Sequence, residues 1–316
     1  MWIIPAVALL LAIALVIFLA VSGKLISLEY ADFPREELEK LISEAPAGEP
    51  VLSGPEEVEL SSPWTRWAMK LLPGTFLVKV KINGHKASLV VDSGASGTYL
   101  SPEVAIAARL ILTNSRFTSH HGGREVPVYA GWVQEMKLGE LRIQGLPVFV
   151  GGNQPVVKLL GLPIWKLDGL LGMEPLQRLA LTLEYERGLV VFRRRPLLLQ
   201  APSVPLRIHR NRTTEGLENL WPLVDCFIGD SGPFSCLIDT GTSGPVQVPS
   251  AVWHALGLGE ERQARLQIQL GEIELVNVPC VIAPGLYPLI GSNIFQAQGI
   301  KRLTLDFLGG KLYAER

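Results

Sequence analysis

The sequence predicts a mostly β protein with two similar lobes that arose by internal duplication, preceded by an N-terminal transmembrane helix. Two observations predict the lobes: a motif of an apolar run, an aspartate, a hydroxyl residue and a glycine occurs twice, and further landmarks follow both copies in the same order. A third predicts the helix, because residues 2–22 carry no charge over a length that can span a bilayer. The predicted boundaries are 1–23 for the transmembrane anchor, 24–74 for an accessory helix and tether, 75–195 for the first lobe and 196–316 for the second.

The duplicated motif ends in Asp-Ser-Gly at residues 92–94 and in Asp-Thr-Gly at residues 239–241. The offset that superimposes the two aspartates also superimposes two turn signals, Asn-Gly at residues 83–84 and Asp-Ser at residues 230–231. Each signal stands between two apolar runs, so each aspartate is predicted at the end of the second strand of a hairpin. A single Asp beside Gly is ordinary turn composition, and only the repetition gives the motif its meaning.

Three landmarks follow each copy of the motif. Turn chemistry gives no reason for such a series to recur in the same order, so an internal duplication is the economical interpretation. The landmarks are Leu-Gly-Glu followed by an apolar-Pro pair (138–147 and 270–279), an apolar-apolar-Gly element (170–172 and 289–291), and a Leu-Thr-Leu strand (181–183 and 303–305).

With these motifs the chain resembles the aspartic peptidases of the pepsin and retropepsin group over roughly residues 75–316. In that group each lobe supplies one Asp-Thr/Ser-Gly motif, and a later apolar-apolar-Gly element packs behind the catalytic loop. The resemblance implies a two-lobed pepsin-like acid-protease fold, with lobes close in size to retropepsin-like subunits fused in one chain. It also implies that the hydroxyls of Ser93 and Thr240 cross-link the two loops. Since one chain supplies both aspartates, a monomer is sufficient for the pair.

The chemistry explains why two carboxylates are needed. Two carboxylates within hydrogen-bonding distance cannot both ionise cheaply, so one keeps a proton and acts as an acid while the other acts as a base. A glycine after each aspartate lets the backbone turn tightly and bring its N–H groups near the carboxylate. The predicted catalytic pair is Asp92 and Asp239, and the predicted supporting residues of the two loops are Ser93, Gly94, Thr240, Gly241 and Thr242.

The predicted function is therefore that of a membrane-anchored aspartic endopeptidase, which hydrolyses peptide bonds with a water molecule activated between the two aspartates. Its expected partners are a peptide or protein substrate and, through the N-terminal helix, a membrane. No cofactor and no metal are expected. The alternative is a catalytically silent peptide-binding module with the same fold, although such a module has no use for two carboxylates that compete for one proton.

The first loop departs from the pepsin pattern at one position. Pepsin-like enzymes usually carry a hydroxyl residue directly after the glycine in both lobes, whereas this chain has Ala95 in the first lobe and Thr242 in the second. A hydrogen bond to a charged carboxylate lowers its pKa. The missing hydroxyl thus predicts activity that reaches less acidic pH than in pepsin.

The two halves also differ in length between the motif and the Leu-Gly-Glu landmark. Residues 111–137 of the first half contain a polar, glycine-rich centre, whereas only residues 258–269 fill the corresponding place in the second. This asymmetry predicts a single flap that closes over substrate, and an ordinary surface hairpin is the alternative. Adjacent histidines at the centre point in opposite directions on a strand, which argues against a metal site. The predicted flap residues are His121, Gly122 and Gly123.

Residues 1–63 carry predictions of their own. A secretory signal peptide competes with the anchor, but the missing basic segment before the apolar run favours an uncleaved anchor. Residues 32–44 predict a short helix, and residues 45–63, rich in Pro, Gly and Glu, predict a flexible tether. The resemblance leaves open that these residues form an inhibitory prosegment.

Charge and cysteine content limit the other function classes. The net charge is −1 and the sequence pI is about 6.5, so no nucleic-acid partner is expected. The three cysteines, Cys226, Cys236 and Cys280, are an odd number, which argues against a disulfide framework. Cys226 and Cys236 flank the turn of the second hairpin symmetrically. Buried free thiols are favoured, and a cross-strand disulfide is the alternative in an oxidising compartment.

Overall fold

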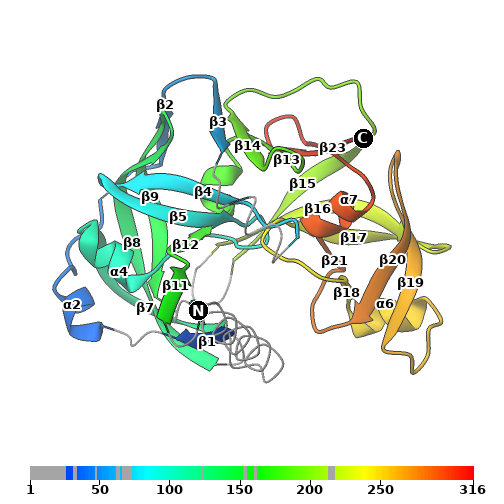
Figure 1. Cartoon of the computed structure of the whole chain (residues 1–316), viewed down its shortest axis with the longest axis horizontal. Coiled ribbons are helices and arrows are strands. Elements are labelled where there is room, and N and C mark those ends of the chain that lie inside the picture. The colour runs from blue at the N-terminus through cyan, green and yellow to red at the C-terminus, as the bar shows by residue number, and fades with distance from the viewer. Residues whose placement is uncertain are drawn as a thin grey trace, which may run out of the picture.

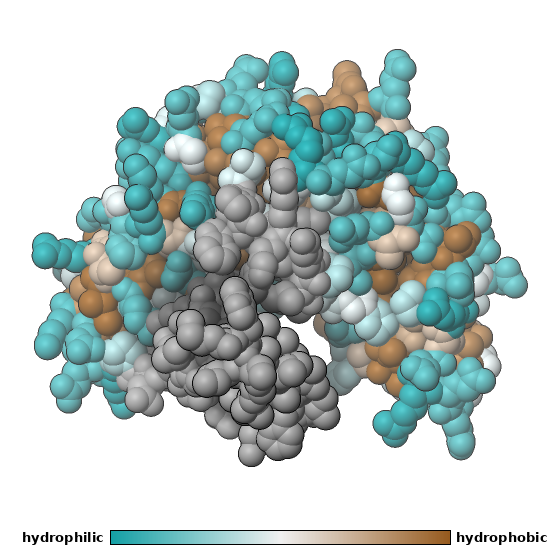
Figure 2. All heavy atoms as spheres, in the orientation of Figure 1, coloured by the Kyte–Doolittle hydropathy of each residue, from teal (hydrophilic) through white to brown (hydrophobic). Residues whose placement is uncertain are grey.

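Two β lobes lie side by side and share a sheet, as Figure 1 shows for this computed structural model of the chain. The structure describes residues 26–30, 34–46, 48–61, 65, 73–121, 124–151, 155–159, 162–212 and 218–316. Hydrophilic side chains cover most of the rim of both lobes in the view of Figure 2. The predicted mostly β, two-lobed architecture is confirmed.

The first half of the chain contains most of the first lobe. Its elements are β1 (Ile26–Tyr30), α2 (Arg35–Glu39), β2 (Val51–Ser53), β3 (Glu57–Ser61), β4 (Leu77–Ile82), β5 (His85–Val91), β6 (Thr98–Leu100), α4 (Pro102–Ala107), β7 (Ile111–His121), β8 (Arg124–Leu138), β9 (Leu141–Gly151), β10 (Pro155–Leu159), β11 (Leu162–Lys166), β12 (Gly169–Leu171), α5 (Met173–Leu176), β13 (Ala180–Glu184) and β14 (Leu189–Arg193).

The second half repeats much of this series. Its elements are β15 (Ser203–Arg212), β16 (Glu218–Ile228), β17 (Ser231–Asp239), β18 (Val246–Val248), α6 (Ser250–Ala255), β19 (Gln263–Leu270), β20 (Ile273–Ile282), β21 (Leu289–Gly291), α7 (Ser292–Ala297), β22 (Arg302–Asp306) and β23 (Lys311–Glu315).

Each lobe closes its sheet into a ring of strands with the same internal order. The ring runs β9-β6-β12-β5-β4-β8 in the first lobe and β20-β18-β21-β17-β16-β19 in the second, and each last strand pairs with the first. Side chains alternate between the inside and the outside of the ring. In β5, for example, Leu89 and Val91 are completely buried in the core. The core of each lobe therefore lies inside its ring. The inward side chains of the strand that leads to the motif aspartate pack into that core.

The apolar-apolar-Gly landmarks form strands that lie at equivalent places in the two rings, each beside the strand that leads to the motif aspartate. Strand β12 pairs in parallel with β5, which sets Leu171 beside Val91, and β21 pairs in parallel with β17, which sets Gly291 beside Asp239. One detail differs from the sequence prediction. The second hairpin turns at residues 229–230, one residue earlier than predicted, because a register shift between Cys226 and Ile228 takes up the extra residue.

The lobes share a six-stranded sheet with the order β15-β23-β22-β13-β14-β3. At its centre β13 and β22 pair antiparallel, with Thr182 directly opposite Thr304 and 2.9 Å between their hydroxyl oxygens. These two threonines are equivalent in the duplicated sequence. An approximate twofold axis therefore passes between them and relates one lobe to the other.

Part of the predicted tether is ordered strand. Residues 51–53 form β2 against β9, and residues 57–61 form β3 against β14. Strand β3 buries Val58 and pairs Glu57 with Arg193 at 2.6 Å. The period-two alternation of Glu with apolar residues is typical of a strand. The sequence prediction gave a tether here because Pro and Gly residues lie close to this segment. The predicted helix at 32–44 is shorter in the structure, where α2 covers only Arg35–Glu39 and anchors itself with the buried Leu38.

The predicted transmembrane anchor at residues 1–23 lies outside the described residues. Within the part of the chain that the structure describes, no helix is long and apolar enough to cross a membrane.

The second hairpin carries a disulfide. Cys226 and Cys236 are joined across strands β16 and β17, with their Cα atoms 6.1 Å apart, a separation that a disulfide can bridge. The prediction of free thiols at these two cysteines is therefore wrong, and the alternative, a cross-strand disulfide, is present. Cys280 is a buried free thiol, and burial raises its pKa to about 12.

Candidate active site

Each motif aspartate lies at the C-terminal end of a strand of its ring: Asp92 directly follows β5, and Asp239 is the last residue of β17. The N–H of Asp92 donates to the carbonyl of Leu171 in β12 at 3.0 Å. Asp239 ends β17 opposite Gly291 of β21. The parallel partner strand therefore fixes the backbone just where each carboxylate leaves the sheet.

Four hydrogen bonds tie the two loops together through Ser93 and Thr240. The N–H of Ser93 donates to the Thr240 hydroxyl at 3.0 Å, and the N–H of Thr240 donates to the Ser93 hydroxyl at 3.0 Å. Each hydroxyl then donates to a carbonyl of the opposite lobe, Ser93 to Ile238 at 2.7 Å and Thr240 to Val91 at 2.8 Å. Both side chains are completely buried. Such a reciprocal set of buried bonds holds the loops at one spacing.

The motif glycines are required by close packing across the axis. A Cβ atom added to Gly94 would overlap the carboxyl group of Asp239, and one added to Gly241 would overlap the carboxyl group of Asp92. Neither position has a positive φ, so the reason is space and not backbone conformation. Each carboxyl group thus lies against the loop of the other lobe, which brings the two carboxyl groups close enough to interact electrostatically.

The two carboxylates have different donors. Oδ1 of Asp92 accepts from the N–H groups of Gly94 and Ala95, at 2.9 and 3.0 Å. Oδ1 of Asp239 accepts from the N–H of Gly241 at 2.8 Å, and its Oδ2 accepts from the Thr242 hydroxyl at 2.7 Å. Among the residues that the structure describes, Asp239 thus has a donor on each of its two oxygens, whereas both donors of Asp92 meet its Oδ1.

This environment raises the pKa of Asp92 well above its ordinary value. Burial is the largest cause, and the neighbouring charge of Asp239 is the second. The N–H groups of Ala95 and Gly94 act in the opposite direction because they stabilise the charged form. Asp92 consequently keeps a proton at a higher pH than an ordinary aspartate does.

Three further hydrogen bonds join the lobes near the loops, and the sequence motifs do not reveal them. The Ser96 hydroxyl accepts from the N–H of Leu220 in β16 at 3.1 Å. The buried hydroxyl of Tyr185 donates to the carbonyl of Ser292 at 2.9 Å, and the Ser292 hydroxyl donates to the carbonyl of Gly74. Only the small, polar character of Ser96 and Ser292 marked them in the sequence, and such residues are common in turns.

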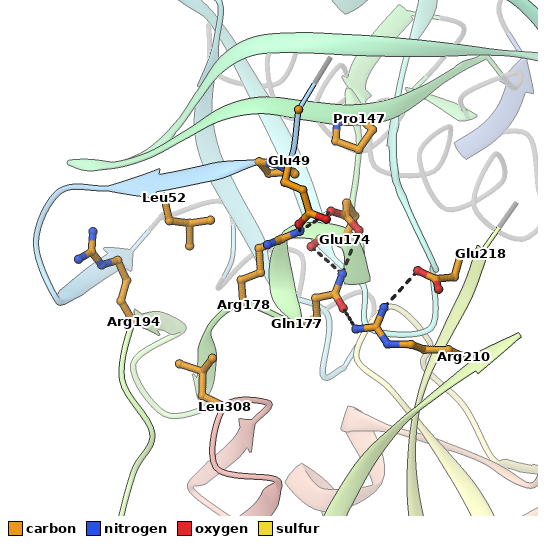
Figure 3. A pocket seen from close by; sticks show the side chains of 12 residues that line it. Glu49, Leu52, Pro147, Glu174, Gln177, Arg178, Arg194, Arg210, Glu218 and Leu308 are labelled. Carbon is orange, nitrogen blue, oxygen red and sulfur yellow. Dashed lines mark hydrogen bonds and ion pairs between the residues drawn. The ribbon is translucent and has the colours of Figure 1, made fainter. Parts of the chain in front are cut away.

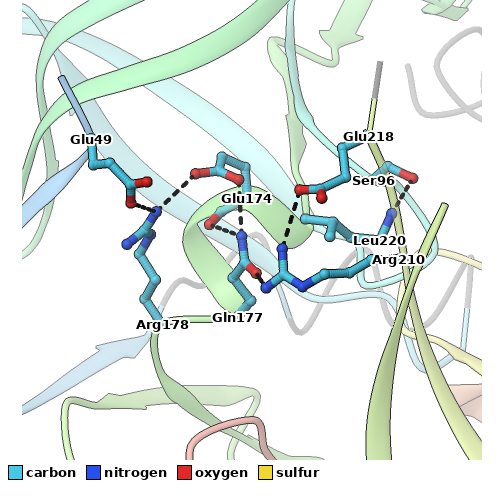
Figure 4. Close-up of polar contacts among 8 residues, drawn as sticks. All are labelled: Glu49, Ser96, Glu174, Gln177, Arg178, Arg210, Glu218 and Leu220. Carbon is cyan, nitrogen blue, oxygen red and sulfur yellow. Dashed lines mark hydrogen bonds and ion pairs between the residues drawn. The ribbon is translucent and has the colours of Figure 1, made fainter. Parts of the chain in front are cut away.

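A polar hollow of about 840 Å³ lies beside these contacts, between α5 of the first lobe and the β15–β16 hairpin of the second (Figure 3). A chain of polar contacts crosses it, and Figure 4 shows how that chain approaches Ser96. Its lobe-to-lobe step is the bond from Arg210 to Gln177 at 2.5 Å. Arg210 also pairs with Glu218 at 3.1 Å, while Arg178 pairs with Glu49 at 3.1 Å and with Glu174 at 3.5 Å.

Burial raises the pKa of Glu174, and the charge of Arg178 opposes that rise. The cations and carboxylates of the hollow are largely matched with one another. We therefore interpret the polar contacts in this hollow as part of the interface between the lobes.

The segment predicted as a flap forms a long hairpin of β7 and β8. Strand β7 pairs with β8 along the outside of the first ring, and among the described residues the second lobe has no counterpart of β7. His121 ends β7 opposite Arg124. Gly122 and Gly123, the predicted tip, lie outside the described residues. No group of three or more His, Cys, Asp or Glu side chains that could hold a metal ion occurs in the described part of the chain.

Comparison with known families agrees with this geometry. Residues 78–174 match the family model of aspartyl proteases, a stretch that runs through the first lobe from β4 to α5 and contains the first Asp-Ser-Gly motif. No curated protein matches the chain. The resemblance to aspartic peptidases is thereby confirmed, and the two ring-shaped lobes fit the two-lobed pepsin-like fold.

Proposed function

We propose that this protein is a membrane-anchored aspartic endopeptidase, in which a water molecule activated between Asp92 and Asp239 hydrolyses the peptide bond. One observation carries the proposal: each carboxyl group packs against the glycine of the opposite motif, in loops that Ser93 and Thr240 tie together. Two carboxyl groups held in this way share a proton, which supplies an acid and a base in one site.

The different donors assign the two roles. Among the described residues, Asp239 accepts a hydrogen bond on each of its two oxygens, which holds the carboxyl group in place. Asp92 has a raised pKa and keeps the shared proton. Asp239 is therefore the base that takes a proton from the water, and Asp92 is the acid that donates to the carbonyl oxygen of the substrate.

The atoms balance in two steps. In the first step the water oxygen bonds to the carbonyl carbon, its proton passes to Asp239, and the proton of Asp92 passes to the carbonyl oxygen. In the second step Asp239 gives its proton to the amide nitrogen, the carbon–nitrogen bond breaks, and Asp92 takes a proton back from a hydroxyl of the tetrahedral intermediate. The pair returns to its starting state without a covalent bond between enzyme and substrate.

The β7–β8 hairpin is proposed as the lid of this site. A hairpin in only one lobe can close over an extended substrate and exclude water without blocking the other side. The described asymmetry between the two rings supports this role.

Membrane anchoring is proposed from residues 2–22, which are uncharged and long enough to span a bilayer. The test is fractionation of cells that express the full chain or a chain without residues 1–23. We expect the full chain to stay with membranes after an alkaline carbonate wash and the shortened chain to be released. A full chain that is recovered in the soluble fraction, shortened at its N-terminus, would show instead that the run is a cleaved signal.

The catalytic proposal is tested with the full chain in detergent micelles, because β2 and β3 belong to the sheets of the lobes and a shorter chain would lose them. A mixed peptide library is incubated at pH 3 to 8, with and without a pepstatin-type inhibitor. We expect cleavage that falls by at least about 100-fold in Asp92→Asn and in Asp239→Asn, since each removes a catalytic proton carrier. A folded wild-type chain that binds peptides but cleaves none at any pH would favour the alternative, a silent peptide-binding module.

A further inference from the structure

A row of positive charges crosses four adjacent strands of the first lobe. Lys86 in β5 is directly opposite Lys81 in β4, and Lys81 is directly opposite Lys137 in β8. Lys137 is in turn directly opposite Arg142 in β9. Directly opposed side chains of neighbouring strands lie on the same face of a sheet. Their charges therefore lie side by side on the outside of the ring.

Such a row costs stability, because like charges directly opposite each other repel. One acidic residue relieves part of this repulsion: Glu135 lies 3.0 Å from Lys137 and 3.8 Å from Arg142. Lys81 and Lys86 are exposed and form no ion pair with any residue that the structure describes. The fold thus compensates the Lys137 end of the row and leaves Lys81 and Lys86 without an acidic partner among the described residues, so this part of the row can attract negative charge from outside.

The row lies on the same sheet face as Asp92. Along β5, Leu89 and Val91 are buried inside the ring, so Lys86 and Asp92, an even number of residues apart, share its outer face. Six residues of strand separate them, which is about 20 Å at the usual rise per residue. Asp92 thus follows one end of the β4–β5 hairpin, and Lys81 and Lys86 lie beside the turn at its other end.

Two features lie between these ends. Nearest Asp92, Leu77, Val90 and Leu167 form a small buried apolar cluster apart from the main core. Beyond it is a hollow of about 410 Å³ next to the β4–β5 hairpin. Four lysines and one aspartate are among the residues that line it: Lys79, Lys81, Lys86, Lys137 and Asp168.

The described strands of the second lobe have no such row on their equivalent face. Strand β16 carries Asp225 there, directly opposite Ser235 of β17. Arg207 of β15 pairs with Asp225 at 2.6 Å and also contacts the Ser235 hydroxyl. Its charge is thus matched locally, and the two sides of the site differ in electrostatic character.

We propose that the lysine face, defined as Lys79, Lys81, Lys86 and Lys137, binds an acidic segment of the protein substrate about six residues from the bond that is cut. This inference rests on the proposed endopeptidase function. An extended peptide has nearly the same rise per residue as β5, so acidic residues at that distance from the bond reach the lysines. Since only the first lobe carries the face, the acidic segment is recognised on one side of the cut bond alone.

The test compares matched peptides that share one apolar cleavage core. One set carries three glutamates five to seven residues before or after the cut bond, and the other carries three glutamines at the same positions. With the full chain in detergent at low salt, we expect kcat/KM to be about five- to tenfold higher for the glutamate peptide on one side only, a range usual for a few exposed charge pairs. The gain should fall toward one in 0.5 M NaCl, because salt screens exposed charges.

The variant Lys81→Glu/Lys86→Glu should abolish this gain while it leaves cleavage of the glutamine peptide unchanged. Lys81→Gln/Lys86→Gln is a milder form that removes the charges without reversal. The matched control is Lys311→Gln, an exposed lysine in β23 outside the first-lobe ring, which should keep the full gain. Equal kcat/KM for glutamate and glutamine peptides, or a gain that survives the double substitution, overturns the inference while the proposed function stands.

If no peptide is cleaved, the proposed function fails, and binding decides the lysine face separately. The probe is the same glutamate peptide with a fluorescent label, and fluorescence anisotropy is measured with Asp92→Asn. Salt-sensitive binding that is lost in Lys81→Glu/Lys86→Glu retains the acidic-peptide surface. No binding, or binding only to vesicles with phosphatidylserine, overturns it.

Discussion

The two lobes repeat one scaffold but differ at the places where a peptidase needs asymmetry. Their rings have the same strand order, and their loops exchange equivalent hydrogen bonds through Ser93 and Thr240. The first lobe, however, has Ala95 after the motif, a long outer hairpin and the lysine face. In the second lobe, the Thr242 hydroxyl donates a hydrogen bond to the motif carboxylate, and the hairpin contains a disulfide. The duplication thus builds the site, and the differences between the copies assign the roles within it.

The largest effect is expected where the lobes touch most closely. Gly94→Ala and Gly241→Ala each introduce a methyl group that overlaps the opposite carboxyl group. Overpacking of this kind costs about 1–3 kcal/mol, and displacement of a catalytic group by about 1 Å costs about 100-fold in rate. Urea unfolding and peptide cleavage measure the two effects. If either variant cleaves within about threefold of the wild type, the close approach of carboxyl group and glycine is wrong.

The next effect concerns the reciprocal hydroxyls. Ser93→Ala and Thr240→Val each remove a buried hydroxyl that donates one hydrogen bond and accepts another. A buried group left without its partner costs about 1–3 kcal/mol. We expect the free energy of unfolding to fall by similar amounts in both variants, because the two positions are equivalent. A loss confined to one variant would mean that the axis does not relate the two loops energetically.

A smaller effect tests the different donors of the two carboxylates. Ala95→Thr gives the first loop the hydroxyl that the second already has, and that hydroxyl favours the charged form of Asp92 and lowers its pKa. Because Asp92 is proposed to act in its protonated form, the pH–rate profile should lose activity on its basic side. The control is Thr242→Ser, which keeps the hydroxyl of the second loop and should leave the profile unchanged. A profile of Ala95→Thr that extends to higher pH would reverse the assignment of acid and base.

The smallest effect concerns the lysine face. Lys81→Gln removes the central charge between Lys86 and Lys137, so the repulsion of the row decreases. We expect the free energy of unfolding to rise by about 0.2–1 kcal/mol at low salt and by less at high salt. Lys311→Gln serves again as the control and should change stability little. A loss of stability in Lys81→Gln would show that the row is compensated within the protein.

Much of the fold and site followed from the sequence because the duplication supplied its own check. The motif aspartates and the landmark glycines lie at equivalent strand positions, as their common offset predicted. Strand β3 was missed because Pro and Gly on either side of residues 57–61 indicated a loop. The disulfide could not be predicted, because it depends on how far apart the two cysteines lie across the paired strands, and their separation along the chain does not determine that distance. The lysine face could not be predicted, since strand register alone brings residues 81, 86 and 137 together.

The most direct test of the central claim, that the two aspartates share one proton, is the stability of wild type and Asp92→Asn between pH 4 and pH 8. A carboxyl group whose pKa is raised by folding contributes stability below its unfolded pKa, and that contribution is lost as the pH rises through its folded pKa. The unfolded value is about 3.9. Urea unfolding measures both chains in the same buffers.

We expect wild type to lose stability relative to Asp92→Asn as the pH rises above about 4, because only wild type must ionise Asp92 beside Asp239. The difference between the two curves should grow and then level off once Asp92 is charged. Parallel curves across the whole range would contradict it, because they would mean that Asp92 ionises in the folded protein as it does in the unfolded chain.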